Sequence, residues 1–392
     1  MRRSAVRELL KLTARPEMIS FAGGLPAAEL FPVDEFRRAT EKVLAERGPN
    51  ALQYGETEGI APLRDWIAGQ FPARLGIGRE NVLITSGAQQ ALDLAGRVLI
   101  EAGDRVVVEN PTYLALLSAW RPLQPQFVPV PMDADGMDLD ALETVMRPCP
   151  KMIYCVPNFQ NPQGVTLIEA RRKRLIEMAR REGVVVLEDD PYGGLRFSGE
   201  RIPSLLELSH DGTDSVLDSP VIHTGTFSKV LAPGLRIGWV VAHESVIECL
   251  GRAKQAMDLH TSTFAQWVAY EIARTGFLER HVPRLCDAYR ERCQTMTAAL
   301  QKFMPPGVSW TEPAGGMFLM VQLPAAMKAR KLLESCLARN VAFVPGAEFH
   351  LNGQGENTMR LNFTNAAPGL IDEGVRRITE VITEGRTADG HG

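Results

Sequence analysis

Continuous apolar runs alternate with helical patterns through the first half of the chain. Four of these runs lie between residues 82 and 187: Val82–Thr85, Arg105–Val108, Lys151–Val156 and Val184–Leu187. Apolar residues recur at helical spacing between the runs, at 88–99 and at 169–181. Continuous apolar runs are typical of strands buried on both faces, and their alternation with helices indicates a parallel sheet covered by helices. We therefore predict an α/β fold for this part of the chain.

The pattern changes in the second half of the chain. Residues 244–276 have the periodicity of a long helical region, and a further helix is predicted from about Glu279 to about Phe303. Short strand-like segments then follow, at VSWTEP, Met317–Val321, VAFVPG and MRLNFTN. This mixture predicts a second, smaller α+β domain over 279–392.

Polar residues follow the predicted strands of the α/β domain at the point where each strand ends. They are Ser86, Tyr113, Asn161, Asp189 and Tyr192. The carboxyl ends of parallel strands share one edge of the sheet, where ligands bind. Ser86-Gly87 also precedes the helix predicted at 88–99, and the unpaired N–H groups of a helix N-terminus favour an anion. Because the glycines do not form G-x-G-x-x-G and no Walker lysine follows, a dinucleotide or nucleoside triphosphate site has little support.

Two strand-like runs within 221–241 enclose a loop rich in hydroxyl and cationic side chains. The loop contains Thr226, Ser228 and Lys229, and Arg236 lies seven residues beyond the lysine. A lysine held between strands can form an imine with an aldehyde, while the two hydroxyls and the arginine are donors suited to phosphate. A surface hairpin with a solvated lysine explains this window equally well when the window is considered alone.

The composition of the chain argues against several classes of function. The 392 residues are 45% hydrophobic and 23% charged, as in an ordinary globular protein, and the net charge of −4 gives no basic surface for nucleic acid. No apolar run is long enough to span a membrane, and residues 1–18 lack the apolar segment of a secretory signal. The six cysteines are scattered and the seven histidines show no ligand spacing, so we expect reduced thiols, a cytosolic protein and no catalytic metal. The run RRKR at 171–174 is expected to form a solvated helix face.

Taken together, these segments resemble the class I aminotransferases, which belong to the fold-type I pyridoxal-phosphate enzymes. The motifs occur in the family's order over nearly the whole chain: Tyr54…Gly59, Ser86-Gly87-Ala88-Gln89, Asn110-Pro111-Thr112-Tyr113, Asn161-Pro162-Gln163-Gly164, Asp189-Asp190-Pro191-Tyr192, Ser228-Lys229 with Arg236, and Arg360. RELLKLTARP, ALQYGETEG and TFSKVLAPGLR are most similar to the 2-aminoadipate aminotransferases, a subgroup that overlaps kynurenine-type aminotransferases. Two positions depart from the family: Gln163 stands where threonine is usual, and Thr226 where serine is common.

The resemblance implies the organisation of the whole protein. It implies a large cofactor-binding domain over 41–278, with a mostly parallel seven-stranded sheet covered by helices. Residues 279–392 would form the small C-terminal α+β domain. Residues 1–40 would be an N-terminal arm and helix that contribute to the small domain and the substrate site. The active unit would be a cytoplasmic homodimer with its sites shared across the interface.

The resemblance also implies the catalytic residues. Lys229 would bind pyridoxal 5′-phosphate covalently through an imine and then act as general base and acid. Asp189 would pair with the pyridine nitrogen and keep it protonated. Tyr192 and Asn161 would hydrogen-bond the phenolic oxygen of the ring, and Tyr113 would stack on the ring.

Further residues are implied in binding the phosphate and the substrate. The phosphate would be held by Ser86, Gly87, Ala88, Gln89, Thr226, Ser228 and Arg236, together with Tyr54 of the neighbouring subunit. Arg360 would bind the substrate α-carboxylate, with Gly24 and Asn161 close by. Arg7, with Ser4 nearby, would receive a distal carboxylate on the substrate side chain, although Arg7 is equally well explained as a surface helix residue. Pro111 and Pro162 are candidates for cis peptide bonds.

The function implied is transfer of an amino group from an L-amino acid to a 2-oxo acid, 2-oxoglutarate above all, by a ping-pong mechanism. The donors implied are 2-aminoadipate, glutamate, and aromatic or branched amino acids. One alternative is another reaction on the same fold, such as β-elimination from cysteine conjugates. A second is a non-catalytic regulatory module that binds the cofactor, which the absence of a basic DNA-reading segment disfavours.

Overall fold

An eight-stranded sheet forms the centre of the larger part of the molecule. The computed structural model describes residues 15, 17–210 and 219–389. In spatial order the strands are β2 (Val82–Thr85), β9 (Gly238–Val241), β8 (Val221–Thr226), β7 (Val185–Asp189), β6 (Met152–Cys155), β3 (Arg105–Asn110), β4 (Gln126–Asp133) and β5 (Gly136–Met137). β9 runs antiparallel to both of its neighbours and β5 runs antiparallel to β4, while the remaining pairs are parallel. The predicted α/β fold is confirmed.

The predicted number of strands was one too low. The additional strand is β5, which returns beside the end of β4 so that Met132 pairs with Met137. Gly136 has a φ of 96°, a conformation that glycine adopts at little steric cost. A two-residue strand after a tight turn is too short to produce a periodic pattern.

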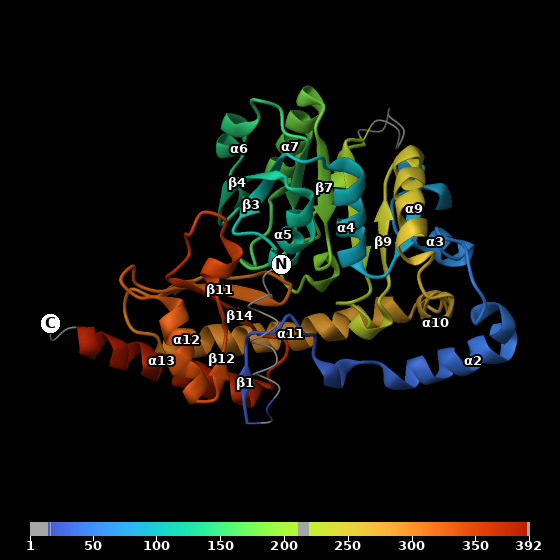
Figure 1. The fold of residues 1–392 in the computed structure, drawn as a ribbon. Helices are drawn as coiled ribbons and strands as arrows, with labels where there is room; N and C mark the ends of the chain where they lie inside the picture. The colour runs from blue at the N-terminus through green and yellow to red at the C-terminus, as the bar shows by residue number, and fades with distance from the viewer. Residues whose placement is uncertain (1–14, 16, 211–218, 390–392) are drawn as a thin grey trace.

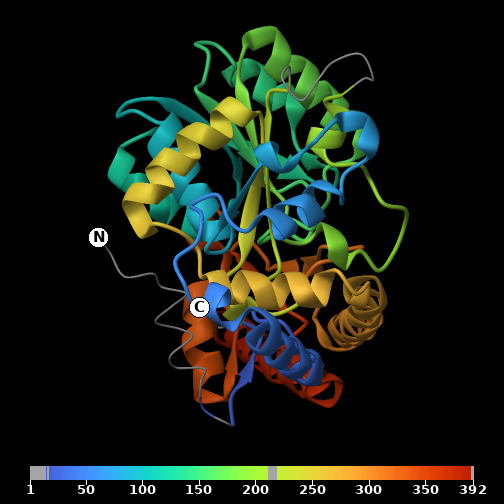
Figure 2. The same cartoon turned by 90° about the vertical axis from the view of Figure 1, so that its right-hand side faces the viewer.

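Helices cover both faces of the sheet (Figures 1 and 2). The helices of this part are α2 (Val33–Ala51), α3 (Ala61–Ala68), α4 (Ala88–Leu99), α5 (Leu114–Trp120), α6 (Leu139–Val145), α7 (Glu169–Glu182), α8 (Leu205–Leu208), α9 (Glu244–Asp258) and α10 (Thr263–Ala273). Successive residues of β3 belong to different cores: Val106 and Val108 pack in one cluster, and Val107 packs in the other. This two-sided burial explains why the strands read as continuous apolar runs. None of the described helices is long and apolar enough to cross a membrane.

The smaller part combines the C-terminal elements with the N-terminal strand (Figure 1). An antiparallel sheet has the order β10 (Ser309–Trp310), β11 (Phe318–Gln322), β14 (Thr358–Asn362) and β13 (Val344–Pro345). Its helices are α11 (Phe277–Phe303), α12 (Ala329–Ala338) and α13 (Pro368–Asp389). β1 (Ile19–Ser20) pairs in parallel with β12 (Val341–Ala342), which joins the start of the described chain to this part. The domain boundaries at 40 and 278 remain a prediction.

The helical region predicted at 244–276 is divided into α9 and α10. The break follows Asp258, where Leu259 has a φ of 64° and a ψ of −60°, which no α-helix can contain. Residues 260–263 contain no apolar side chain, and α10 restores the apolar pattern beyond them.

Arg172 corrects the expectation of a solvated face at 171–174. Lys173 is exposed and Arg174 is partly exposed, whereas the Arg172 side chain is fully buried. Its guanidinium donates to the carbonyl oxygens of Leu167, Pro203 and Pro157 and to Asn158 Oδ1, at 2.7–3.0 Å. Arg172 therefore ties α7 to the loop that begins at Pro157.

We expect Arg172→Met to destabilise the protein strongly, because it leaves several buried acceptors without a donor. The loss should be about 3 kcal/mol or more. Arg174→Met is the matched control on the same helix, since Arg174 lies on the surface and pairs with Asp140 and Glu143. Chemical denaturation of both variants measures the difference. Equal unfolding midpoints for the two variants would contradict the structural role of Arg172.

Candidate active site

A cavity of about 690 Å³ opens at the carboxyl ends of the strands and contains most of the predicted site residues. The predicted residues that line it are Gly24, Ala88, Gln89, Tyr113, Asn161, Asp189, Tyr192, Thr226, Ser228, Lys229, Arg236 and Arg360. They come from both parts of the molecule, since Arg360 lies on β14 and Asp189 lies on β7. The fold thus assembles segments that are widely separated in the sequence.

Lys229 follows the end of β8, and its side chain projects into the cavity. Its Nζ donates to the Gly24 carbonyl oxygen at 2.9 Å. Burial, together with the nearby cations Arg360 and Arg236, lowers the pKa of Lys229 from 10.5 to about 8. A substantial fraction of the amine is therefore neutral near neutral pH, which is the form that attacks a carbonyl carbon.

Asp189 ends β7, and its carboxylate is held by two hydroxyl groups. Tyr154 donates to Oδ2 and Thr224 donates to Oδ1, each at 2.9 Å. Burial raises the pKa of Asp189 to about 6, although the two hydrogen bonds act in the opposite direction. Each carboxylate oxygen keeps a further lone pair, so Asp189 can still accept a hydrogen bond from a cationic N–H in the cavity.

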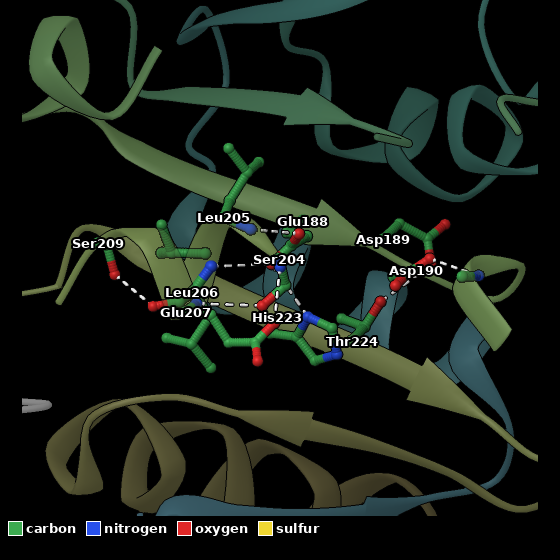
Figure 3. Close-up of polar contacts among 12 residues, drawn as sticks. Glu188, Asp189, Asp190, Ser204, Leu205, Leu206, Glu207, Ser209, His223 and Thr224 are labelled. Atoms are coloured by element: carbon green, nitrogen blue, oxygen red, sulfur yellow. Dashed lines mark hydrogen bonds and ion pairs between the residues drawn. The ribbon is translucent and has the colours of Figure 1, made fainter. Parts of the chain in front are cut away.

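Glu188 lies on the other face of β7, as alternation along a strand requires. Its carboxylate accepts from the backbone N–H groups of Leu205 and Leu206 at 2.7 and 3.1 Å (Figure 3). His223 Nδ1 lies 3.0 Å from Glu188 Oε2, and this carboxylate raises the pKa of His223 despite its burial. The strand end that carries Asp189 is therefore held in place by polar contacts on the opposite face of the sheet.

The first turn of α4 faces Arg236 and forms what we call the phosphate cradle, defined as the Ala88 and Gln89 N–H groups and the Arg236 guanidinium. The first N–H groups of a helix have no partner within the helix, and the helix dipole favours an anion there. Gly87 permits the close approach, because a Cβ at this position would lie 2.4 Å from Arg236 Nη2. Arg236 itself has a φ of 53°, an uncommon conformation that is often found at functional sites.

Ser86 and Gly87 are not among the residues that line the cavity. The Ser86 hydroxyl donates to Asp258 Oδ2 at 3.1 Å and lies 3.3 Å from Thr261 Oγ1. The Ser86 hydroxyl is therefore already engaged in this structure, and the predicted contribution of Ser86 to phosphate binding remains a prediction. Thr226 and Ser228 do line the cavity, and their hydroxyls lie 2.9 Å apart.

Arg360 is buried and also lines the cavity. Its Nη1 donates to Asn161 Oδ1 at 2.8 Å and its Nη2 donates to the Ala22 carbonyl oxygen at 2.6 Å. The guanidinium lies over the Phe318 and Phe349 rings, 4.2 and 5.0 Å from their centroids. Burial lowers its pKa to about 10, so the group stays cationic at neutral pH. Within the described part of the chain, Arg360 Nε has no hydrogen-bond partner.

Asn161 links Arg360 to the aromatic residues of the site. Its Nδ2 donates to the Tyr192 hydroxyl at 3.4 Å, and burial raises the pKa of Tyr192. Tyr113 immediately precedes α5, and its hydroxyl group donates to Gln89 Oε1 at 3.4 Å. The Asn110–Pro111 and Asn161–Pro162 peptide bonds are both cis, as predicted, and so is Arg147–Pro148.

Besides Ser86 and Gly87, one described residue of the predicted site, Tyr54, does not line this cavity. Arg7 and Ser4 lie outside the described residues. Tyr54 is 78% exposed. Its ring packs edge-on against His260, with the ring centroids 5.7 Å apart.

Sequence reasoning missed several residues that shape the site. Tyr154 and Thr224 orient Asp189, while Phe318 and Phe349 surround the Arg360 guanidinium. Tyr154 and Thr224 lie within buried strands, and both phenylalanines read as ordinary core residues. The pairing of β6 and β8 with β7 would have revealed the first two, because both neighbours of Asp189's strand can reach its carboxylate.

Comparison with known proteins decides the family. The sequence model of the family described as aminotransferase class I and II matches residues 16–378. The chain belongs to this family. It is 46% identical to a 2-aminoadipate transaminase from Thermus thermophilus, over 97% of this chain and 94% of the relative.

Two solved structures are similar over nearly their whole length. One is a kynurenine aminotransferase from Pyrococcus horikoshii in complex with PMP, with a TM-score of 0.93 at 45% identity over 98% of this chain and 95% of that one. The other is an α-aminoadipate aminotransferase from Thermus thermophilus complexed with N-(5′-phosphopyridoxyl)-L-leucine, with a TM-score of 0.91 at 43% identity over 98% and 95%. This protein is therefore a pyridoxal-phosphate-dependent aminotransferase, and the predicted resemblance is confirmed.

The cavity fits this cofactor. The phosphate cradle offers donors to a phosphate, Asp189 offers an acceptor to a protonated ring nitrogen, and Lys229 offers an amine to an aldehyde. When bound, pyridoxal phosphate supplies an aldehyde for the substrate amine and a ring that takes up electrons from the substrate α-carbon. A nucleotide-binding protein is excluded by the family assignment.

We expect capture of an aldehyde by Lys229 to increase with pH through about 8, because the reactive amine is neutral above its pKa. Arg360→Met should move this midpoint to higher pH, since a neighbouring cation that disfavours the ammonium form is removed. The measurement is the absorbance of cofactor-free protein mixed with pyridoxal, which lacks the phosphate, across pH 6–10.

Arg97→Met is the control, because Arg97 is an exposed residue of α4 that pairs with Asp93. It should leave the midpoint unchanged. A midpoint that stays the same in Arg360→Met would show that the two cations do not interact, and Lys229→Ala should give no absorbance band at any pH.

Proposed function

We propose that this enzyme transfers the amino group of an L-amino acid to a 2-oxo acid, with 2-oxoglutarate as acceptor, by a ping-pong mechanism. The observation that carries the proposal is that Arg360 and Lys229 line one cavity. Donor and acceptor both have an α-carboxylate next to the reacting carbon. If both bind through Arg360, they must occupy the same place in turn, which is the order of a ping-pong reaction.

The α-carboxylate would bind to a rigid cation. Asn161 and the Ala22 carbonyl oxygen hold two nitrogens of Arg360, and Phe318 and Phe349 exclude water from its faces. A charge-assisted hydrogen bond is stronger at such a site than in water. Because the guanidinium is already held in place, little side-chain entropy is lost when substrate binds.

Lys229 would move the proton at the substrate α-carbon. Its Nζ lies in the cavity near Gly24, and a pKa of about 8 suits a group that must act as base and then as acid near neutral pH. Asp189 would keep the ring nitrogen protonated, since its carboxylate is ionised above about pH 6. Tyr192 and Asn161 would hydrogen-bond the phenolic oxygen of the ring.

The side-chain preference is proposed to be broad, covering 2-aminoadipate, glutamate, and aromatic or branched donors. Apolar residues line part of the cavity, including Leu25, Leu114 and Ala115, so an apolar substrate side chain would meet matching surface. The names of the relatives point the same way, because they cover 2-aminoadipate and kynurenine enzymes. Arg7 is proposed to receive the distal carboxylate of acidic donors.

We expect single L-amino acids to convert the loaded enzyme from its pyridoxal to its pyridoxamine form without an acceptor. The measurement is a spectral screen of the half-reaction with 2-aminoadipate, glutamate, leucine and phenylalanine, followed by recovery of the first spectrum with 2-oxoglutarate. Arg7→Ala should slow the acidic donors more than the apolar ones. Equal losses for both classes would refute the role of Arg7.

The same screen distinguishes transamination from the alternative reaction, β-elimination. A β-eliminating enzyme would release pyruvate and ammonia from a cysteine conjugate with no 2-oxo acid present. If the spectrum responds to no donor while pyruvate forms, the transamination proposal fails and elimination takes its place.

The active unit is proposed to be a homodimer in which Tyr54 contacts the cofactor phosphate of the neighbouring subunit. Tyr54 does not line the cavity of its own chain, and its exposed ring stands beside other exposed apolar side chains in its segment, such as Leu52. His260, which packs against Tyr54, follows the exposed Leu259. Burial of these exposed apolar side chains against another chain would favour association.

Mixing two inactive variants tests the shared site. We expect Lys229→Ala and Tyr54→Ala each to have little activity alone. Coexpression should restore activity, because a mixed dimer would contain one site with an intact Lys229 from one chain and an intact Tyr54 from the other. No restoration in mixed dimers that are verified by mass would contradict the crossing of Tyr54.

A further inference from the structure

An ion pair between a buried lysine and a partly buried aspartate contacts the turn that precedes the phosphate cradle. Lys254 and Asp258 are one helical turn apart on α9, and Lys254 Nζ donates to Asp258 Oδ1 at 2.7 Å. The Lys254 side chain is fully buried, and neither residue lines the cavity. Burying the Lys254 ammonium group costs desolvation energy, and the attraction of a carboxylate does not always offset that cost. The other contacts of the ion pair indicate what it does.

Asp258 holds Ser86 by two routes. Asp258 Oδ2 accepts from Ser86 Oγ at 3.1 Å and from Gln90 Nε2 at 2.7 Å. Gln90 Oε1 in turn accepts from the Ser86 N–H at 2.7 Å. The remaining polar group, the Ser86 carbonyl oxygen, accepts from Arg236 Nη2 at 3.1 Å. Every polar group of Ser86 is therefore fixed, and one of them fixes the arginine of the phosphate cradle.

The backbone after Asp258 is strained in a way that keeps this carboxylate at the end of α9. Leu259 has a φ of 64° and a ψ of −60°, and the His260 N–H donates to the Asp258 carbonyl oxygen at 2.7 Å. These values describe a γ-turn with positive φ, which is rare and costly for a residue other than glycine. Such a turn persists only where the surroundings over-determine the conformation, as the contacts of Asp258 do.

We propose that Lys254 and Asp258 position the phosphate cradle for the cofactor phosphate, with Ser86 as the connecting residue. The carboxylate supplies acceptors to the Ser86 hydroxyl and to Gln90 at once. Lys254 neutralises that carboxylate, which would otherwise repel a phosphate bound in front of the turn. Lys254 and Asp258, which do not line the cavity, are positioning residues that act through Ser86. The proposal rests on the proposed placement of the phosphate at the cradle.

The test compares two aldehydes that differ only in the phosphate. Cofactor-free protein is titrated with pyridoxal 5′-phosphate and with pyridoxal, and the two dissociation constants are measured. We expect Lys254→Met to weaken binding of the phosphate ester about tenfold or more, because it leaves Asp258 with an uncompensated charge, while pyridoxal binding changes by less than about twofold. Asp258→Asn should have a smaller effect of the same kind. The double variant should bind the ester better than Lys254→Met alone, since the repelling charge is gone.

Arg252→Met is the matched control. Arg252 pairs with Glu248 at the same spacing on the same helix, but both side chains are exposed, so binding of neither aldehyde should change. If Lys254→Met does not fold, Ser86→Ala carries the test, with a selective loss for the phosphate ester expected again. Equal losses for both aldehydes, or no loss for the ester in any variant, would overturn the proposal. Because only binding is measured, a protein that binds the ester as expected but transfers no amino group would refute the proposed function and not this role.

Discussion

The structure depends on cations that are buried against main-chain carbonyl oxygens. Lys229 contacts the carbonyl of Gly24, Arg360 contacts that of Ala22, and Arg172 contacts several in the loop at 157 and beyond. A carbonyl satisfies a donor without cancelling its charge, whereas a carboxylate would do both. The cavity therefore keeps positive charge available for phosphate and carboxylate groups. Lys254 shows the contrast: it lies behind the cavity, and there a carboxylate does neutralise it.

These same contacts set the chemistry of Lys229. Burial and two neighbouring cations lower its pKa to about 8, and no carboxylate contact is recorded for its Nζ among the described residues to raise it again. The anions that bind during the reaction then complement the cations that the fold has left unpaired. Asp189 is the anionic counterpart in the same cavity. Burial raises its pKa, and the hydrogen bonds from two hydroxyl groups limit that rise.

Much of the fold and of the site could be predicted from the sequence, because both leave local patterns. Continuous apolar runs located β3, β6 and β7, and the motif after each run located Tyr113, Asn161 and Asp189. Lys229 and Arg236 were found because a short loop holds both. These residues are marked by their position at the end of an element, and that position can be read along the chain.

The remainder depends on contacts between distant segments, which no local pattern records. Arg172 is one of four consecutive basic residues, a pattern that predicts a solvated helix face. Its guanidinium nevertheless contacts the loop that begins at Pro157. Tyr154 reads as a core residue until β7 is placed beside β6. At the break after α9, Asp258 contacts Ser86, which is far away in the sequence, and no local pattern records this contact.

The carbonyl contacts of the N-terminal segment have a consequence for how this protein varies. Ala22 and Gly24 contribute these contacts through the backbone, which every amino acid possesses, so the contacts with the cations do not depend on the side chain at either position. They depend on the path of the chain, because β1 pairs with β12 and fixes which carbonyl faces which cation. A comparison that scores side chains would not detect this role. A deletion of one residue between 20 and 24 would nevertheless shift both carbonyls away from their cations.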